Sequence, residues 1–451
     1  MKLPRITISG ARGIVGDDLT VESAVRLSRA FGRLMGKGMV VIGRDARPSG
    51  QMIEGAVAAG LMAEGLDVVR LGPVPTPTVG IMVRKLGATG AVNVTASHNP
   101  VEWNALKLYN EQGLFISPSQ INRLAELAQE TDEHATGTTC GRSRDDHTAF
   151  ETHSLRVHES IEGLSIVTRG YRVAVDGCRS VGGIFLPRLL RELGCEVIEL
   201  DCEPDGQFTR PLEPTPSALE SLCDRVKSRK CAVGFAMDPD ADRLSLVDEQ
   251  GVAIGEEYTL ALAVKHVLSR RGGGTAVVNL SSSMMVDAAA ALAGGRVVRT
   301  AIGEAHVVEG MMREKAAIGG EGNGGVIFPD IHPGRDAMAG AGLILEAMAL
   351  SGKPLSALAA ELPKTTILKD KLEIASFPGP DWVNRAIADI SEGIIDTTDG
   401  VKVVFDDGWY HVRLSNTESI FRNMAEAGTP ERAQSLLDTA RKVAQAAARS
   451  V

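Results

Sequence analysis

The stretch Arg172-Val-Ala-Val-Asp-Gly-Cys-Arg-Ser-Val-Gly-Gly183 decides the fold class. Its apolar start predicts a buried strand, and its glycine- and serine-rich end predicts a loop that leads into a helix. The helix is expected over 186–193, and Gly194 then permits the left-handed conformation that ends a helix. The next run, Gly194-Cys-Glu-Val-Ile-Glu-Leu200, predicts a second strand. This order of strand, helix and strand is typical of a parallel βαβ unit.

The same pattern occurs twice more in the chain. One copy has predicted strands at Met39–Gly43 and Gly65–Leu71, and another has them at Thr275–Leu280 and Gly294–Arg299. Each copy places a loop and a helix rich in small residues between its strands. The repetition predicts three similar α/β domains with mixed parallel sheets.

Changes in composition divide the chain into four expected domains. The last part contains predicted strands at Gly400–Phe405 and Gly408–Arg413 and an amphipathic helix from about Pro430, which is typical of a smaller α+β domain. The expected boundaries are 1–148, 149–252 and 253–364 for the α/β domains and 365–451 for the α+β domain.

Composition excludes several classes of protein. The chain has 451 residues, 44% hydrophobic and 23% charged, which is typical of a folded soluble protein. A formal net charge of −9 argues against a nucleic-acid partner. The start of the chain lacks the apolar segment of a signal peptide, and no long uncharged apolar run predicts a membrane span. The six cysteines show no Cys-x-x-Cys pair, so we expect free, buried thiols in a cytoplasmic protein.

The first candidate chemical loop is Thr95-Ala-Ser-His-Asn-Pro100, which follows the apolar run Ala91–Val94. Ser97 is therefore expected at the carboxyl end of a strand, where open α/β sheets bind ligands. The glycines of a hydrolase nucleophile elbow are absent. A serine, histidine and asparagine after a strand also occur in ordinary turns and helix caps.

The second candidate loop is Ala236-Met-Asp-Pro-Asp-Ala-Asp-Arg243. Its alternating carboxylates, Asp238, Asp240 and Asp242, point the same way in an extended loop. Such carboxylates repel one another unless a cation neutralises them, and oxygen ligands alone favour Mg²⁺, Ca²⁺ or Mn²⁺ over Zn²⁺. We expect the loop to be exposed, and a solvated acidic turn is the alternative.

Two further loops carry polar groups suited to a sugar phosphate. Ile318-Gly-Gly-Glu-Gly-Asn-Gly-Gly325 contains Glu321 and Asn323, whose carboxylate and amide suit sugar hydroxyls. The segment from Arg413 is expected to leave a strand and enter a helix. Its cations, hydroxyls and amide form a possible phosphate site. The residues concerned are Arg413, Ser415, Asn416, Thr417 and Arg422. A flexible turn and ordinary helix capping are the respective alternatives.

Taken together, these loops resemble the α-D-phosphohexomutase family over nearly the whole chain and in the family's order. The matching motifs are Ser9-Gly-Ala-Arg-Gly13, Gly43-Arg-Asp-Ala-Arg-Pro-Ser-Gly50, Thr95-Ala-Ser-His-Asn-Pro100, Asp238-Pro-Asp-Ala-Asp-Arg243, Gly320-Glu-Gly-Asn323, Gly334-Arg-Asp-Ala337 and Arg413-Leu-Ser-Asn-Thr-Glu418. The resemblance implies that hexose 1-phosphate and hexose 6-phosphate are interconverted through a phosphorylated Ser97 and a hexose 1,6-bisphosphate.

The resemblance also implies a role for each candidate residue. One Mg²⁺ per chain is expected on the three aspartates and a phosphate oxygen of Ser97, and a hexose 1,6-bisphosphate is the expected activator. Arg12 and Arg243 are expected to stabilise charge. The candidate proton-transfer groups are Lys107, then His98 and His306. Sugar contacts are expected from Glu321 and Asn323, and contacts to the distal phosphate from Arg413, Ser415, Asn416, Thr417 and Arg422.

Some positions depart from the family's usual motifs and leave the preferred sugar open. The sugar loop ends Asn323-Gly-Gly325 where the family usually has Ser-Gly-His, and Ser419 replaces a proline in the phosphate loop. The segment Trp103-Asn-Ala-Leu-Lys107 replaces the usual Tyr-Asn-Gly-x-Lys. The sugar loop resembles archaeal-type members, and phosphoglucosamine mutase is the first expectation. Phosphomannomutase or phosphoglucomutase is the second.

Two other functions would also use an acidic loop after a strand. In a haloacid-dehalogenase-like phosphatase, Asp238 would be the nucleophile and Asp240 the acid/base, but Ser97 and the last domain would have no role. The other function is non-catalytic binding of a metal or sugar. The favoured interpretation is a cytoplasmic monomer or homodimer with a phosphosugar substrate and no membrane or nucleic-acid partner.

Overall fold

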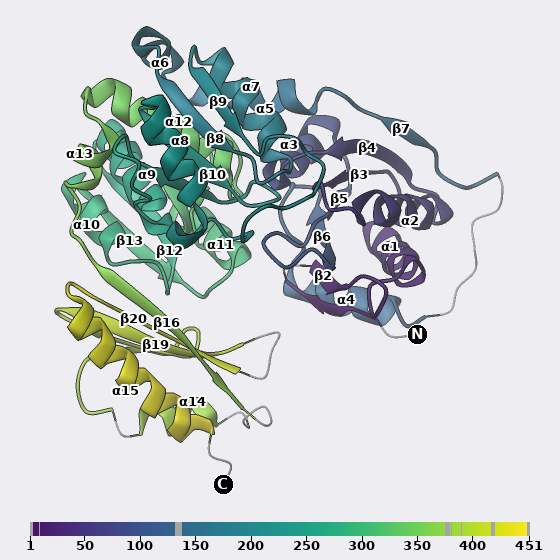
Figure 1. Ribbon diagram of the computed structural model, residues 1–451. Coiled ribbons are helices and arrows are strands. Elements are labelled where there is room, and N and C mark those ends of the chain that lie inside the picture. The colour runs from purple at the N-terminus through teal and green to yellow at the C-terminus, as the bar shows by residue number, and fades with distance from the viewer. Residues whose placement is uncertain are drawn as a thin grey trace. The chain divides into compact units, whose positions relative to one another are not determined.

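The computed structural model describes residues 3–8, 10–130, 138–374, 379, 381–388, 390–415 and 420–448. The chain forms two compact units: Met1–Thr259 with Asn323–Ala357, and Leu260–Gly322 with Leu358–Val451 (Figure 1). The chain passes from one unit to the other within helix α9 (Glu256–Arg271), between Gly322 and Asn323, and within helix α13 (Leu355–Ala359). The boundaries of the four domains expected from composition stay a prediction.

The first part of unit 1 is a seven-stranded mixed sheet with the order β1-β2-β6-β5-β3-β4-β7. Its strands are β1 (Arg5–Thr7), β2 (Gly10–Ile14), β3 (Met39–Arg44), β4 (Asp67–Pro73), β5 (Gly90–Val94), β6 (Trp103–Asn110) and β7 (Ser143–Asp145). Its helices are α1 (Val21–Met35), α2 (Gly50–Ala63), α3 (Thr76–Leu86) and α4 (Pro118–Leu127). Strand β5 is buried along its whole length between β3, which is parallel to it, and β6, which is antiparallel.

The second part of unit 1 is a four-stranded sheet with the order β11-β10-β8-β9. Its strands are β8 (Arg172–Asp176), β9 (Glu196–Leu200), β10 (Val233–Met237) and β11 (Leu244–Val247). The helices are α5 (Ala149–Ser160), α6 (Gly163–Arg169), α7 (Gly182–Glu192) and α8 (Glu220–Arg229). Strand β15 (Gly325–Ile327) and helix α12 (Ala337–Ser351) also belong to unit 1, and α12 packs against α6.

Unit 2 contains the third copy of the repeat. Strand β12 (Gly274–Asn279) lies between β13 (Gly295–Thr300) and β14 (Ile318–Glu321) and is parallel to both. The helices of this copy are α10 (Met285–Leu292) and α11 (Glu304–Glu314). In all three copies, the first predicted strand is paired in parallel with the second, as the sequence pattern predicts.

The rest of unit 2 is a five-stranded antiparallel sheet with the order β16-β20-β19-β18-β17. Its elements are β16 (Thr366–Glu373), α14 (Trp382–Ile387), β17 (Ile394–Asp396), β18 (Val401–Phe405), β19 (Gly408–Leu414), β20 (Ile420–Ala427) and α15 (Pro430–Ala448). Helix α15 lies along one face of the sheet (Figure 1), where its buried alanines and leucines join the core of this domain. The predicted α+β class is confirmed.

One local prediction in this domain is wrong. The segment after Arg413 leads into strand β20 and not into a helix. Residues Ile420–Ala427 pair on one side with β16 and on the other with β19, so the sheet satisfies their backbone groups. Because a strand between two partners is buried on its inner face, the pairing overrides the weak local preference of this segment.

Other expectations concerned cysteines and membrane spans. All six cysteines lie in the described ranges: Cys178, Cys195 and Cys231 are buried as expected, Cys202 and Cys223 are half-buried, and Cys140 is exposed. Among the residues described, no helix combines the length and apolar character needed to span a bilayer.

Candidate functional site

The Ser97 loop begins where β5 ends, at the carboxyl edge of the first sheet. Ser97 itself is 3% exposed and has a φ of 51°, in the left-handed region that is unfavourable for a residue other than glycine. Such a conformation costs about 1–3 kcal/mol and persists only where the surroundings hold it. The Ser97 N–H donates to Thr95 Oγ1 at 3.0 Å, and the Asn99 N–H donates to the Ala96 carbonyl.

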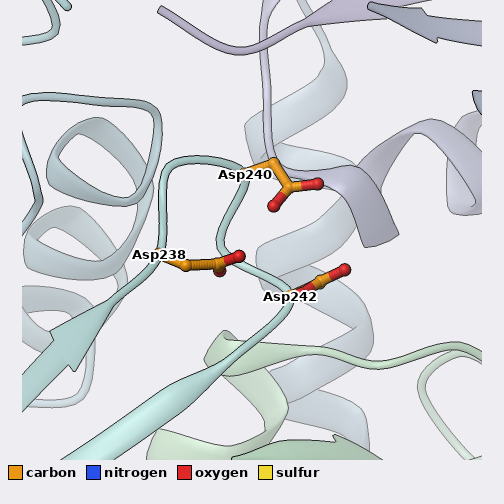
Figure 2. Close-up of side chains that lie close together, drawn as sticks. All are labelled: Asp238, Asp240 and Asp242. Atoms are coloured by element: carbon orange, nitrogen blue, oxygen red, sulfur yellow. The ribbon is translucent and has the colours of Figure 1, made fainter. Parts of the chain in front are cut away.

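The three aspartates occupy the loop between β10 and β11, and their carboxylates converge on one side of it (Figure 2). Asp238, Asp240 and Asp242 are each 0% exposed. The expectation of an exposed loop is therefore wrong. The loop is buried because other segments of unit 1 cover it, and Thr76 contributes both a backbone N–H to the Asp240 carbonyl and a hydroxyl to the Asp240 carboxylate.

Unit 1 brings the serine and the aspartates together. The Ser97 hydroxyl donates to Asp238 Oδ2 at 2.7 Å, although the two residues are 141 positions apart. The His98 Nδ1 atom lies 3.3 Å from the same hydroxyl. Two loops that follow strands of different sheets thus meet at a single hydroxyl group.

Lys107 lies on β6 and extends its ammonium group into the aspartate cluster. Its Nζ donates to Asp240 Oδ2 at 2.6 Å and to Asp242 Oδ2 at 3.2 Å. Burial disfavours the charged lysine, but the two aspartates outweigh burial and raise the pKa of Lys107. Burial also works against the charged form of Asp240, yet Lys107 holds the pKa of that carboxyl well below its usual range. Burial, with its two acidic neighbours, raises the pKa of Asp238.

The aspartate cluster fits a divalent cation. One oxygen from each carboxylate lies within 4.8 Å of the others. Asp240 Oδ1 and Asp242 Oδ1 are buried and have no hydrogen-bond partner in the described part of the chain. Buried carboxylate oxygens without a donor are costly, and a hard cation that prefers oxygen ligands would satisfy them. The three residues can therefore hold a metal ion.

Positive groups surround the two loops. Arg12 lies on β2 and donates to the Asn99 side chain at 2.5 Å, which brings it to the Ser97 loop. Burial, with Arg243 and Arg12 nearby, lowers the pKa of His98 to about 2. The Arg243 N–H donates to Asp238 Oδ1, and its guanidinium donates to Glu213. Burial likewise lowers the pKa of Arg12.

In unit 2, Glu321 ends strand β14 and is held by two donors. Asn279 Nδ2 donates to its Oε1 atom at 2.8 Å, and the Gly303 N–H donates to the same atom at 3.2 Å. Gly303 is the residue before helix α11, and His306 lies in the first turn of that helix. Glu321 and His306 are therefore brought to the same edge of the third sheet. Asn323 belongs to unit 1, where its side chain accepts the Gly325 N–H.

The predicted phosphate loop connects β19 and β20. Arg413 and Arg422 are Cα partners in this hairpin, and the Ser415 N–H donates to the Ile420 carbonyl. Asn416 and Thr417 lie outside the described residues. The Asp399 carboxylate accepts the Arg413 Nε–H at 3.4 Å and the Ile302 N–H at 2.9 Å. Asp399 thus connects the hairpin with the segment that leads to helix α11.

Several residues that hold the site were assigned no role from the sequence. They are Arg47, Thr76, Asn279, Arg335 and Asp399. Arg335 donates to Asp242 Oδ2 at 2.7 Å. Arg47 lies in the motif Gly43–Gly50 and Arg335 in the motif Gly334–Ala337. Both motifs resemble those of the family, and this resemblance was the available sequence signal for the two arginines. The sequence carried no comparable signal for Thr76 or Asp399.

Family models match consecutive parts of the chain. They are described as phosphoglucomutase/phosphomannomutase, alpha/beta/alpha domain I over residues 6–135, domain II over 156–251, domain III over 255–366, and the C-terminal domain over 375–443.

Relatives and solved structures resemble the chain over nearly its full length. A "Probable phosphoglucosamine mutase" of Methanopyrus kandleri is 38% identical over 433 residues, 95% of each chain. A "Phosphoglucomutase/phosphomannomutase" of Thermococcus kodakarensis is 36% identical over 97% of this chain and 98% of its own. A solved phosphoglucomutase/phosphomannomutase family protein from Burkholderia thailandensis is 28% identical, with a TM-score of 0.85 over 98% of both chains. A putative phosphomannomutase from Thermus thermophilus has a TM-score of 0.83 at 28% identity, over 99% of this chain and 100% of its own.

Proposed function

This chain belongs to the phosphoglucomutase/phosphomannomutase family, whose members are enzymes that transfer phosphate within hexose phosphates, and we propose that it interconverts hexose 1-phosphate and hexose 6-phosphate. The observation that carries the proposal is the 2.7 Å contact between the Ser97 hydroxyl and Asp238. It places a buried nucleophilic oxygen against a cluster of carboxylates that suits a metal ion.

The proposed reaction uses Ser97 as the phosphoryl carrier. The bond between phosphorus and the Ser97 oxygen breaks while a bond forms to O1 or O6 of the hexose monophosphate; the sugar hydroxyl gives its proton to a base and the Ser97 oxygen takes one up. The resulting 1,6-bisphosphate turns around, and the Ser97 oxygen attacks its other phosphorus and loses its proton. The bond from that phosphorus to the sugar oxygen breaks, and the sugar oxygen takes up a proton.

Lys107 is our first candidate for the proton transfer because its buried Nζ lies beside Asp240 and Asp242. Against the effect of burial, these aspartates raise the pKa of Lys107, and the amine could accept the proton once a cation bound to them offset that effect. His98 and His306 are the alternatives.

We propose Mg²⁺ as the ion, held by Asp238, Asp240 and Asp242 together with a phosphate oxygen on Ser97. When bound, it supplies charge neutralisation at the serine oxygen in the loose transition state of phosphoryl transfer. Arg12 and Arg243 stabilise the charge of the transferred group from the protein side, since both lie against the two loops.

The other residues are proposed to bind the sugar hydroxyls and the distal phosphate of the substrate. Glu321 and Asn323 accept the sugar hydroxyls, and the preset carboxylate of Glu321 supports this role. The distal phosphate is bound by the β19–β20 hairpin through Arg413, Ser415, Asn416, Thr417 and Arg422. A bisphosphate must present both of its ends in turn, so a phosphate site separate from Ser97 is required by this chemistry.

We propose glucosamine phosphate as the preferred sugar, with hexose 1,6-bisphosphate as the activator. The relative from Methanopyrus kandleri, named as a probable phosphoglucosamine mutase, supports this choice. The relative from Thermococcus kodakarensis supports phosphomannomutase or phosphoglucomutase activity as the second candidate. Parallel assays with the 1-phosphates of glucosamine, glucose and mannose separate the two by their values of kcat/KM.

The test of the mechanism is the Ser97→Ala variant. Wild-type protein incubated with a hexose 1,6-bisphosphate should gain a phosphoryl group by intact-protein mass spectrometry, and Ser97→Ala should gain none and lose turnover. The matched control is Ser228→Ala, at an exposed position of helix α8, which should behave as wild type. Near-normal turnover in Ser97→Ala would contradict the proposed mechanism. Steady release of inorganic phosphate without isomerisation would instead indicate a phosphatase.

A further inference from the structure

Arg47 is a buried arginine for which the mechanism proposed above has no role. It belongs to the motif Gly43-Arg-Asp-Ala-Arg-Pro-Ser-Gly50 and lies in the loop between β3 and α2. Arg47 is 1% exposed, and Asp45 beside it is 0% exposed. The Nε atom of Arg47 donates to Asp45 Oδ2 at 3.1 Å. A buried ion pair requires further hydrogen bonds to offset the loss of water.

The remaining guanidinium donors all bind backbone carbonyl groups of the Ser97 loop and its continuation. Nη2 donates to the Ser97 carbonyl at 2.6 Å and to the Asn99 carbonyl at 2.5 Å. Nη1 donates to the Pro100 carbonyl at 2.6 Å and to the Trp103 carbonyl at 3.0 Å. The five N–H groups of the guanidinium are thereby all used, four of them on one short segment.

The contacts form a closed ring around Ser97. The Ser97 N–H donates to Thr95 Oγ1, and the Thr95 hydroxyl donates to Asp45 Oδ2 at 2.6 Å. Asp45 pairs with Arg47, and Arg47 binds the Ser97 carbonyl. The N–H group of Ser97 is thus bound through Thr95, and its carbonyl group directly, to the same ion pair of Asp45 and Arg47. This arrangement explains how Ser97 keeps its left-handed φ of 51°.

The second repeat contains a similar pair of an aspartate and an arginine. Asp45 accepts the N–H two residues later, as do Asp176 in the second repeat and Asn279 in the third. Arg210 forms two hydrogen bonds with Asp176 and donates to the carbonyl of Met237, the residue before Asp238.

In the third repeat, Asn279 binds Glu321 directly. Asparagine replaces aspartate there because the partner is a carboxylate and needs a donor. In every repeat, the polar residue at the end of the central strand thus helps to hold the chemical loop of the strand beside it.

We propose that Arg47 is a positioning residue for phosphoryl transfer, which fixes the backbone of Ser97 so that the serine oxygen stays aligned with the aspartate loop. This inference rests on the proposed function of Ser97. It requires the planar fork of arginine, because a lysine ammonium cannot reach four carbonyl groups spread over this segment. If Arg47 had only a structural role, its substitution would lower the stability of the protein without a selective effect on the rate of phosphoryl transfer.

The first test is Arg47→Lys, which keeps the charge next to Asp45 and loses the fork. We expect kcat to fall at least 10-fold and phosphoryl uptake by Ser97 from hexose 1,6-bisphosphate to slow by the same factor. The KM for the hexose phosphate and the affinity for Mg²⁺, measured by calorimetry, should stay within about 3-fold of wild type, since their proposed ligands are unchanged. The matched variant is Arg210→Lys, which should alter Mg²⁺ affinity because Arg210 binds beside Asp238.

A second readout does not depend on activity. Amide hydrogen exchange should become faster in residues 95–103 of Arg47→Lys and stay unchanged in strand β10. If the wild-type chain turned over no hexose phosphate, the proposed function would fail, and this measurement would still test the contact itself. Unchanged exchange, or a folded Arg47→Lys protein with the wild-type kcat, would overturn the proposal.

A further variant covers the case in which Arg47→Lys does not fold. Thr95→Val removes one hydroxyl from the ring, keeps the shape of the side chain and leaves the ion pair in place. It should lower kcat and leave KM close to wild type. A Thr95→Val enzyme with unaltered kcat would overturn the proposal equally.

Discussion

Arg413 and Arg422 are directly opposite each other across strands β19 and β20. Side chains at opposed positions of an antiparallel pair lie on the same face, and two cations placed in this way repel each other. Asp399 contacts Arg413 at its Nε atom, and Arg422 is exposed. A dianionic phosphate would be attracted to both guanidinium groups, which supports the role proposed for this hairpin.

Arg413→Ala should raise the KM for hexose phosphate by roughly 10-fold or more. A charge-assisted hydrogen bond to a phosphate contributes about 1.5–3 kcal/mol and is made in the ground state as well as in the transition state. The bisphosphate intermediate should also escape, so steady turnover should need added hexose 1,6-bisphosphate. Kinetics and chromatography of the released bisphosphate measure the two effects.

The control for this variant is Arg432→Ala in helix α15, where the arginine pairs with Asp407 away from the hairpin loop. It should leave KM and bisphosphate dependence unchanged. If Arg413→Ala matched this control in both measurements, the hairpin would not be the phosphate site.

Asp240→Asn should weaken Mg²⁺ binding and slow the reaction by roughly 10²–10⁴-fold. The substitution removes the negative charge of one proposed metal ligand, and the metal ion is proposed to neutralise the charge that develops on the Ser97 oxygen. Asparagine fills the same space and leaves the Thr76 contact possible, so the protein should fold. Calorimetric titration with Mg²⁺ and assays in excess chelator measure the two effects. Asp224→Asn, at an exposed position of helix α8, is the control. Full activity of the wild type in excess chelator would count against the metal site.

Asn279→Asp should raise the KM for hexose phosphate by roughly 10-fold. The change replaces the N–H donor that lies 2.8 Å from Glu321 Oε1 with a second carboxylate, so the two groups repel. The same substitution at exposed Asn384 in helix α14 should have no effect on kinetics. An unaltered KM in Asn279→Asp would show that the orientation of Glu321 does not matter for substrate binding.

Acid should destabilise unit 1 through His332. Burial, with Arg84 nearby, lowers the pKa of His332 to about 3. The unfolded state therefore binds more protons between pH 6.5 and pH 3, and stability falls as the pH falls through this window. At pH 5 the loss is about 2 kcal/mol relative to pH 8.

Urea unfolding of wild type and His332→Gln at pH 8 and pH 5 isolates this contribution. The variant should lose about 2 kcal/mol less than wild type between the two values of pH. His147→Gln removes an exposed histidine and should follow the wild type. Equal losses in wild type and His332→Gln would contradict the assignment.

The strand, loop and helix order of the three repeats was predictable from local patterns. Runs such as Arg172–Asp176 are apolar because the strand is buried, and the glycines that follow mark where the chain turns. The fate of Ile420–Ala427 was not predictable in this way, because its pairing with β16 and β19 decides it. The same holds for the buried aspartates, which are covered by residues distant in the sequence.

The sequence by itself determined which side chains are candidates for the proposed chemistry: Ser97, the three aspartates, Glu321 and Arg413 all stand in short motifs whose residue types suit that chemistry. Only the tertiary structure decided how these groups are held. Arg47 binds four carbonyl groups that begin 50 positions further along the chain. Backbone carbonyl groups are the same in every residue, so no pattern of side chains can reveal which of them a distant guanidinium will reach.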